Sequence, residues 1–186
     1  MSLELSGVLL VGGASTRFGS PKALARFRGE TLAERAWGVL GEACEERLAV
    51  GKAGELALPL PVLGDGSELR APIVGMIAGL REAEHETVVF LPVDCPLVTP
   101  ELLRALAEAR AVPQTGPLPG AYSKADLPEL ERRLAAGELS LRGVNANVLE
   151  VDERLLANAN TPDELSALEE DLAALDEERP GLAVDS

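Results

Sequence analysis

A glycine-rich loop with two cationic side chains offers the first chemistry in this sequence. It lies in the stretch VLLVGGASTRFGSPKAL, where an aliphatic run ends at Gly12 and Gly13 and is followed by Arg17 and Lys22. Glycine has no Cβ atom, so the backbone can turn sharply there and bring its amide groups close to a ligand. Because both of the following charged side chains are cations, the pattern favours an anionic ligand.

Neither of two common phosphate-binding fingerprints describes this loop. In a P-loop, lysine directly follows the second glycine, whereas here Ser-Pro separates Lys22 from Gly19. The dinucleotide pattern G-x-G-x-x-G also fails, because Gly12 and Gly13 are adjacent. The residues alone leave two alternatives, a phosphate-binding turn or an ordinary strand-to-helix turn with solvent-facing cations.

Hydrophobic patterns predict strands that alternate with helices. Short aliphatic runs indicate buried strands, and apolar residues at helical spacing, preceded by threonine caps or first-turn prolines, indicate helices. This alternation is typical of a mostly parallel sheet with helices on both faces, an α/β fold with three layers. The predicted strands are residues 5–11, 48–50 and 87–93, and the predicted helices are 31–43, 72–83, 127–136 and 162–175, with one more starting at Thr99.

Asp94 directly follows the predicted strand 87–93, on the same edge of the sheet as the glycine loop. Ligands of open parallel sheets bind beyond the carboxyl ends of the strands, because loops and helix N-termini converge there. A single carboxylate together with phosphate oxygens and water is sufficient to hold Mg²⁺. Asp94 is therefore a candidate magnesium ligand, and the alternative is a residue that only shapes the turn.

Length, composition and charge exclude several classes of protein. The 186 residues are 46% hydrophobic, which predicts one globular domain over 1–186 with an acidic, frayed tail from about residue 176. We see neither a membrane span nor a signal peptide and expect a cytoplasmic protein. The net charge of −14 disfavours nucleic acid and anionic membranes as partners. Cys44 and Cys95 lack metal-type spacing and are expected to be buried, reduced thiols.

The glycine loop resembles the signature of the GT-A-like nucleotidyltransferases, in the form found in the molybdenum cofactor guanylyltransferases, the MobA-like proteins. The matching residues are Gly12-Gly13-x-Ser15-x-Arg17-Phe18-Gly19-x-x-Lys22-x-Leu24. The resemblance implies a Rossmann-like fold and a backbone that wraps a nucleotide, with Arg17 and Lys22 on its phosphates as catalytic cations. The nucleotide-binding residues that it implies are Leu10, Val11, Gly12, Gly13, Ser15, Arg17, Lys22 and Asp65.

Three further stretches resemble the same family in the same order. Asp65 precedes the segment Ala71-Pro72-Ile73-Val74-Gly75 and corresponds to the aspartate that reads the guanine edge. Leu91-Pro92-Val93-Asp94 resembles the metal site, which makes Asp94 the Mg²⁺ ligand. Asn158-Ala159-Asn160-Thr161-Pro162 resembles the acceptor segment, so Asn158 and Asn160 are expected to bind the pterin. The proline- and glycine-rich residues 116–122 are either a plain loop or a segment that borders the acceptor site.

The resemblance implies a Mg²⁺-dependent transfer of GMP from GTP to the phosphate of molybdopterin, with release of pyrophosphate. It also implies contact with other proteins of molybdenum cofactor biosynthesis or with recipient molybdoenzymes. Two enzymatic alternatives remain, a cytidylyltransferase acting on the same pterin and a nucleotidyltransferase acting on a sugar phosphate. A third alternative is an adaptor that binds nucleotide or pterin without catalysis.

Overall fold

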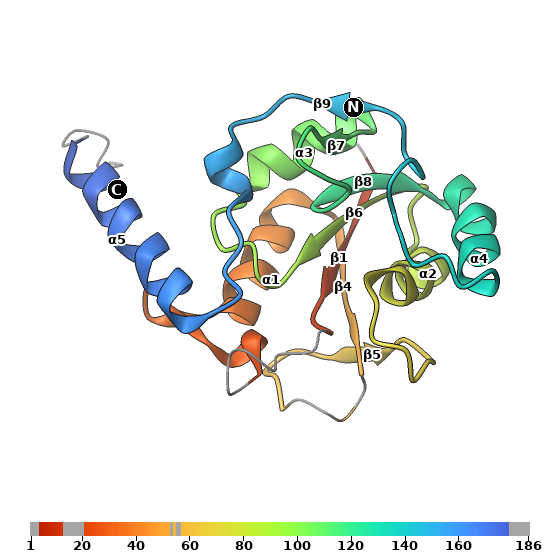
Figure 1. Cartoon of the computed structure of the whole chain (residues 1–186), viewed down its shortest axis with the longest axis horizontal. Helices are drawn as coiled ribbons and strands as arrows, with labels where there is room; N and C mark the ends of the chain where they lie inside the picture. The colour runs from red at the N-terminus through yellow and green to blue at the C-terminus, as the bar shows by residue number, and fades with distance from the viewer. Residues whose placement is uncertain (1–3, 13–20, 53, 55–56, 179–186) are drawn as a thin grey trace.

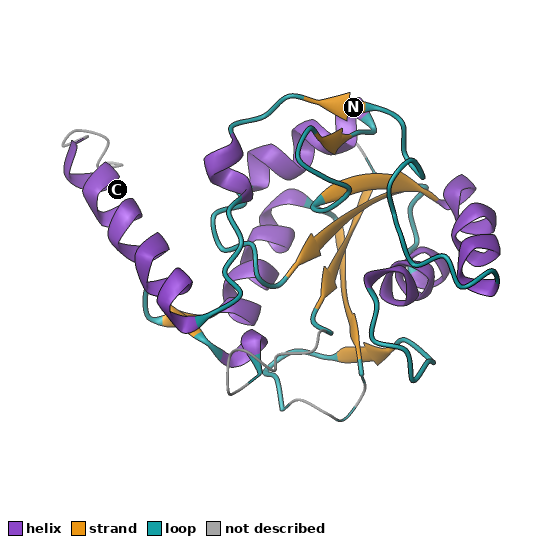
Figure 2. Cartoon of the chain, viewed as in Figure 1, coloured by secondary structure: helices purple, strands orange, loops and turns teal. Residues whose placement is uncertain are grey.

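A five-stranded sheet forms the centre of the computed structural model (Figures 1 and 2), which describes residues 4–12, 21–52, 54 and 57–178. The strand order is β5-β4-β1-β6-β8, and every neighbouring pair is parallel except β6 and β8. The sheet is therefore mostly parallel, as predicted. Its strands are β1 (Leu5–Leu10), β4 (Glu46–Gly51), β5 (Val62–Gly64), β6 (Thr87–Pro92) and β8 (Gly120–Ser123).

Helices cover both faces of this sheet and complete the predicted α/β/α layers (Figure 2). On one face, α1 (Leu32–Ala43) and α3 (Pro100–Ala109) contact each other and pack on the sheet. On the other face, α2 (Pro72–Glu82) contacts α4 (Leu127–Ala135) in the same manner. The sheet thus has a hydrophobic core on each side, which is the arrangement that continuous aliphatic strands require.

The central strand β1 contributes side chains to both cores. Leu5 and Leu9 pack in the core under α1 and α3, whereas Val8 and Leu10 pack in the core under α2 and α4. Successive side chains of a strand point to opposite faces, so a strand buried on both sides needs apolar residues at every position. This explains why the sequence of β1 shows no alternation of polar and apolar residues.

The predicted helix starts are confirmed by their caps. Thr31 accepts a hydrogen bond from the backbone of Glu34, whose carboxylate in turn accepts one from the backbone of Thr31. This reciprocal pair is a capping box. Thr99 accepts a hydrogen bond from the backbone N–H of Leu102 at 3.2 Å, and Pro100 occupies the first helical position. The last helix, α5 (Pro162–Glu178), continues three residues beyond its predicted end at 175.

Several short elements were not predicted. Residues 116–122 were expected to form a plain loop or to border the acceptor site, but the end of this segment enters β8 and pairs antiparallel with β6. Two pairs of short strands also form among the described residues. In the first, β2 (Arg26–Phe27) pairs with β3 (Glu30–Thr31), and in the second, β7 (Val112–Pro113) pairs with β9 (Val148–Leu149). The 3-10 helices are η1 (Lys22–Leu24), η2 (Lys124–Asp126) and η3 (Glu153–Leu156).

Both cysteines are free, as expected, and they differ in burial. Cys95 is buried, as expected, whereas Cys44, which directly follows α1, is only half-buried. Burial raises the pKa of the Cys44 thiol to about 12, because the charged thiolate would lose its hydration. Within the described part of the chain, no helix has the length and apolar character needed to cross a membrane.

Candidate active site

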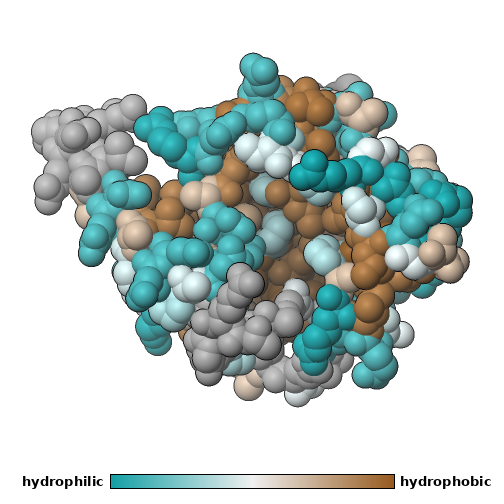
Figure 3. Space-filling model, viewed as in Figure 1, coloured by the Kyte–Doolittle hydropathy of each residue, from teal (hydrophilic) through white to brown (hydrophobic). Residues whose placement is uncertain are grey.

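Three neighbouring strands end at the same level and leave a pocket beyond their carboxyl ends. Leu10 of β1 is in register with Val50 of β4 and with Pro92 of β6, so the chain segments that follow these residues emerge side by side. The pocket has a volume of about 340 Å³ and a largely apolar floor. In Figure 3, hydrophobic atoms are exposed in a hollow near the centre of the face. This is the edge at which the sequence predicted a ligand.

One part of the site is organised around Lys22. Its ammonium nitrogen donates to Oδ2 of Asp94 at 2.9 Å and to Oδ1 of Asn160 at 2.8 Å. The backbone explains how Asn160 reaches this place, because the N–H of Ala159 donates to the carbonyl of Asp94 at 3.0 Å. The N–H of Asn160 then donates to the carboxylate of Glu164 in α5 at 2.6 Å. Three segments that are distant in the sequence thus meet at one cation.

A second lysine–aspartate pair lies in the same pocket. Lys52 donates to both carboxylate oxygens of Asp65 at 2.8 Å, and both side chains are largely buried, with 12% and 8% exposed. The register explains the pairing, because Gly51 of β4 lies opposite Gly64 of β5 and the paired residues come directly after them. We did not predict Lys52 as a site residue. Its place directly after a strand that ends at the ligand edge was the signal that could have found it.

The structure brings together the other predicted residues that it describes. Leu10, Val11 and Gly12 line the pocket with Lys22, Asp65 and Asp94. Gly13, Ser15 and Arg17 lie outside the described residues. Leu118, from the segment that was expected to be a loop or to border the acceptor site, lines the pocket as well.

The asparagines predicted to bind the pterin are in different environments. Asn160 is half-buried and contacts Lys22, whereas Asn158 is exposed. Among the described residues, Asn158 forms no hydrogen bond. The structure therefore ties Asn160 to the Lys22–Asp94 pair and leaves Asn158 beside it at the surface.

Beside Gly12, which was predicted to approach a ligand, the structure shows a close approach between two strand ends that was not predicted. A Cβ atom on Gly12 would lie 3.6 Å from the Cα atom of Gly51, which is an ordinary contact. A Cβ atom on Gly51 would instead lie 2.7 Å from a methyl group of Val11 and 3.3 Å from the backbone nitrogen of Gly12. The tight packing of the two strand ends therefore depends on Gly51.

The oxygen atoms that surround the Lys22 ammonium are of the kind that binds a hard divalent cation. Asp94 and Asn160 place a carboxylate oxygen and an amide oxygen on one cationic nitrogen, and oxygen atoms are the ligands that Mg²⁺ prefers. Burial and the neighbouring Asp94 carboxylate raise the pKa of the Cys95 thiol, so this sulfur stays protonated. Within the described residues there is no group of three or more acidic, histidine or cysteine side chains that could form a closed metal cage. The oxygen atoms of Asp94 and Asn160 instead fit an open magnesium site, in which other ligands of the ion come from the substrate and water.

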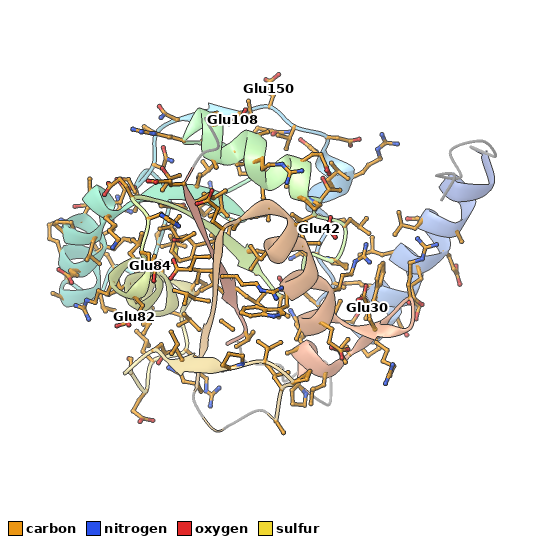
Figure 4. The ribbon with its side chains drawn as sticks, turned by 180° about the vertical axis from the view of Figure 1, so that it is seen from behind. Glu30, Glu42, Glu82, Glu84, Glu108 and Glu150 are labelled. Atoms are coloured by element: carbon orange, nitrogen blue, oxygen red, sulfur yellow. The ribbon has the colours of Figure 1, made fainter. Side chains whose placement is uncertain are left out.

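The acidic excess of the chain lies largely on the outside. Seen from behind in Figure 4, Glu42 projects from α1, Glu108 from α3 and Glu82 from α2, and each of them is exposed. Charges on the far surface are screened beyond about 8 Å in physiological salt. The net charge of −14 therefore does not by itself prevent an anionic ligand from binding in the pocket.

The fold and this pocket define an α/β nucleotidyltransferase, and comparison with known proteins specifies the family. The family model described as "MobA-like NTP transferase domain" matches residues 7–171. The chain belongs to this family, which confirms the resemblance recognised in the glycine loop.

Two curated relatives that align with most of this chain are each named "probable molybdenum cofactor guanylyltransferase". The protein of Chloroflexus aggregans is 31% identical over 196 aligned positions, which cover 90% of this chain and 94% of the relative. The protein of Deinococcus radiodurans is 38% identical over 152 positions, which cover 75% of this chain and 78% of the relative.

Solved structures show the same fold. A crystal structure of an Aquifex aeolicus protein is 31% identical, covers 84% of this chain and 93% of its own, and has a TM-score of 0.69. Molybdopterin-guanine dinucleotide biosynthesis protein A of Archaeoglobus fulgidus has a TM-score of 0.74 at 24% identity, over 91% of this chain and 99% of its own. A Thermus thermophilus cytidylyltransferase acting on methylerythritol phosphate has a TM-score of 0.66 at 17% identity, over 90% of this chain and 98% of its own. At such low identity, the last two likenesses describe the fold alone.

Proposed function

We propose that this chain transfers GMP from GTP to the phosphate of molybdopterin and releases pyrophosphate. The observation that carries the proposal is one pocket lined by two lysine–aspartate pairs, at the edge of the sheet where nucleotides bind in this fold class. The relatives that match most of the chain are named for guanylyl transfer in molybdenum cofactor synthesis. The names of these relatives favour GTP over the CTP of the cytidylyltransferase, which shares only the fold.

The two pairs would bind opposite ends of the nucleotide. Asp65 would accept hydrogen bonds from the ring N–H and the exocyclic amine of guanine, which are both donors. Lys22 would lie at the phosphates with Arg17, a role that we propose from the sequence signature. The backbone from Leu10 to Gly13 and Ser15 would wrap the nucleotide between these ends. Cations at the phosphates neutralise the charge that develops during phosphoryl transfer.

Asp94 would hold Mg²⁺, with the amide oxygen of Asn160 beside it. A bound magnesium ion neutralises phosphate charge and orients the triphosphate. The chain's own groups supply alignment, because Lys22 is fixed between Asp94 and the acceptor segment. The acceptor phosphate is already an oxyanion at neutral pH, so the reaction needs no general base. Its oxygen forms a bond to the α-phosphorus of GTP while the bond to the leaving pyrophosphate breaks.

Asn158 and Asn160 would bind the acceptor pterin on the side of the pocket next to Asp94. We further propose that residues 1–186 act as one nucleotidyltransferase domain in the cytoplasm, where GTP is available and the two thiols stay reduced. There the chain would meet other proteins of molybdenum cofactor biosynthesis or the recipient molybdoenzymes.

The direct test is pyrophosphate release from the purified chain with Mg²⁺, molybdopterin and one nucleoside triphosphate at a time. We expect release with GTP and far less with ATP, CTP or UTP. Asp163→Asn provides a matched control, because this carboxylate is exposed in the first turn of α5. A preference for CTP would contradict the guanylyl assignment, and pterin binding without pyrophosphate release would support the adaptor alternative.

A further inference from the structure

The Lys52 ammonium is fully engaged by protein oxygen atoms. Besides the two carboxylate oxygens of Asp65, it donates to the backbone carbonyl of Leu69 at 2.8 Å and to that of Ser67. A lysine has three N–H groups, and here they face four acceptors. Lys52 therefore has no donor left for a ligand in this arrangement, although it lines the nucleotide pocket.

The same contacts determine how Asp65 can bind a ligand. Oδ1 of Asp65 accepts from Lys52 and also from the backbone N–H of Ser67 at 3.1 Å. Oδ2 accepts from Lys52 alone among the described groups. Each carboxylate oxygen has two lone pairs, so Oδ2 keeps one of them for a further donor. Because the three N–H groups of Lys52 face four acceptors, Oδ1 can give up its contact with Lys52 and accept a second donor without leaving an N–H group of Lys52 unpaired. The backbone N–H of Asp65 is also fixed, because it donates to the carbonyl of Gly51 at 2.9 Å.

Lys52 further ties down the segment that forms one wall of the pocket. Its contacts with the carbonyls of Ser67 and Leu69 hold the chain just before Arg70 and Ala71, which line the pocket and lead into α2. One side chain therefore orients the carboxylate and shapes the wall beside it.

We propose that Lys52 is a positioning residue that determines base specificity by holding Asp65 in the orientation that reads guanine. This inference rests on the proposed role of Asp65 in guanine recognition. Lys52 acts on the base through Asp65 and makes no contact with the phosphates. Removing it should weaken the binding of every guanine compound by the same factor, whatever its number of phosphates.

The experiment measures the affinity of Lys52→Met for guanosine, GMP, GDP and GTP by calorimetry, without pterin. We expect a loss of about 10-fold or more throughout the series, as for one charge-assisted hydrogen bond. Binding of ATP should weaken much less than binding of the guanine compounds, because adenine has no ring N–H donor for Asp65 and can lose only the contribution of the pocket wall. Lys124→Met is the matched control, since this lysine lies in η2 outside the pocket lining. The control variant should bind guanosine, GMP, GDP and GTP with the affinities of the wild type. A loss that grows with the number of phosphates would overturn the inference, as would unchanged guanosine binding.

A double-mutant cycle separates this inference from the proposed function. Asp65→Asn should bind GTP poorly and XTP well, because xanthine has a carbonyl where guanine has the amine. Unchanged preference for GTP in that variant would refute the role of Asp65 itself. Adding Lys52→Met to Asp65→Asn should change GTP affinity by less than about 2-fold, because the residue through which Lys52 acts is already altered. A further 10-fold loss would assign Lys52 a direct ligand contact and overturn the inference.

The single variant Lys52→Met leaves a largely buried carboxylate without its cation and is expected to lose stability. Lys52→Arg keeps the positive charge, and the double variant removes both charges, so each provides a folded protein for the comparison. We expect Lys52→Arg to recover part of the guanosine affinity, because a guanidinium can also bind both oxygens of a carboxylate. If Lys52→Arg binds guanosine no better than a folded Lys52→Met, the proposed orientation of Asp65 is contradicted. If Lys52→Met does not fold, the comparison of the double variant with Asp65→Asn tests the inference.

Discussion

The ammonium nitrogen of Lys22 lies 2.9 Å from Oδ2 of Asp94, although the two residues are 72 positions apart in the sequence. Both side chains are shielded, with 18% and 22% exposed, so their attraction is less screened than that of a surface pair. The contact joins the segment after β1 to the segment after β6. It thereby links the glycine loop of the sequence signature to the candidate metal ligand.

Replacing Asp94 by asparagine should lower the rate of pyrophosphate release by about 100-fold or more, as the loss of a group that stabilises developing charge does. The fold should persist, because asparagine has nearly the same shape as aspartate and keeps an oxygen that can accept the hydrogen bond from Lys22. Turnover and thermal unfolding measured on the same preparation test both statements. Turnover like that of the wild type would remove Asp94 from the metal site.

The two asparagines of the acceptor segment should give different kinetic effects. Asn160→Ala removes a hydrogen-bond acceptor of Lys22 as well as a proposed pterin contact. We therefore expect the KM for molybdopterin to rise and kcat to fall about 10-fold, the equivalent of one hydrogen bond to a charged group. Asn158→Ala should raise the KM for molybdopterin with little change in kcat, because Asn158 is exposed beside the site. Steady-state kinetics with varied pterin distinguish these outcomes. Identical effects of the two substitutions would contradict the separate roles.

The capping box at the start of α1 should make a measurable contribution to the free energy of unfolding. Thr31→Ala removes the side-chain acceptor for the backbone of Glu34 and should cost about 1 kcal/mol. For a chain of this size, the melting temperature should fall by roughly 2–4 °C. Thr31→Ser retains the hydroxyl and is the control, with a melting temperature close to that of the wild type. Equal losses in both variants would show that the methyl group, and not the cap, matters.

The two thiols should resist alkylation in the folded protein. Iodoacetamide reacts with the thiolate, and burial raises the pKa of Cys44 to about 12, so at pH 8 the thiol form dominates. Labelling should stay slow between pH 7 and pH 9 in buffer and become fast in urea, where the thiols regain a pKa of about 8.5. Mass spectrometry of the labelled peptides tests this for each cysteine. Rapid labelling of native Cys95 at pH 8 would be incompatible with its burial.

Elements with strong local signals were predicted well from the sequence. The strand β6 consists of β-branched, aliphatic and aromatic residues up to its final proline, and the helices α1 and α3 carry threonine caps, so local chemistry determines them. In contrast, β8 was expected to be a loop or a segment bordering the acceptor site, because glycine and proline dominate the preceding residues. Its strand conformation comes from pairing with β6, which no local pattern reveals.

The repeated Asn-Ala-Asn sequence shows how similar residues acquire different roles. Asn145 and Asn147 both donate through their amide groups to the carbonyl of Arg110, where α3 ends in a left-handed residue. They fasten a loop and do not reach the pocket lining, whereas Asn160 contacts Lys22. The sequence alone could not separate these roles, because they depend on which segment each asparagine meets in the folded chain.

The chain has only three lysines, and two of them are paired with the aspartates of the pocket. Each carboxylate thus has a built-in counterion before any ligand arrives. A triphosphate adds several negative charges to a site whose lysines are already neutralised. A metal ion that enters with the triphosphate would supply compensating charge that the paired lysines cannot, so the nucleotide should bind productively as its metal chelate.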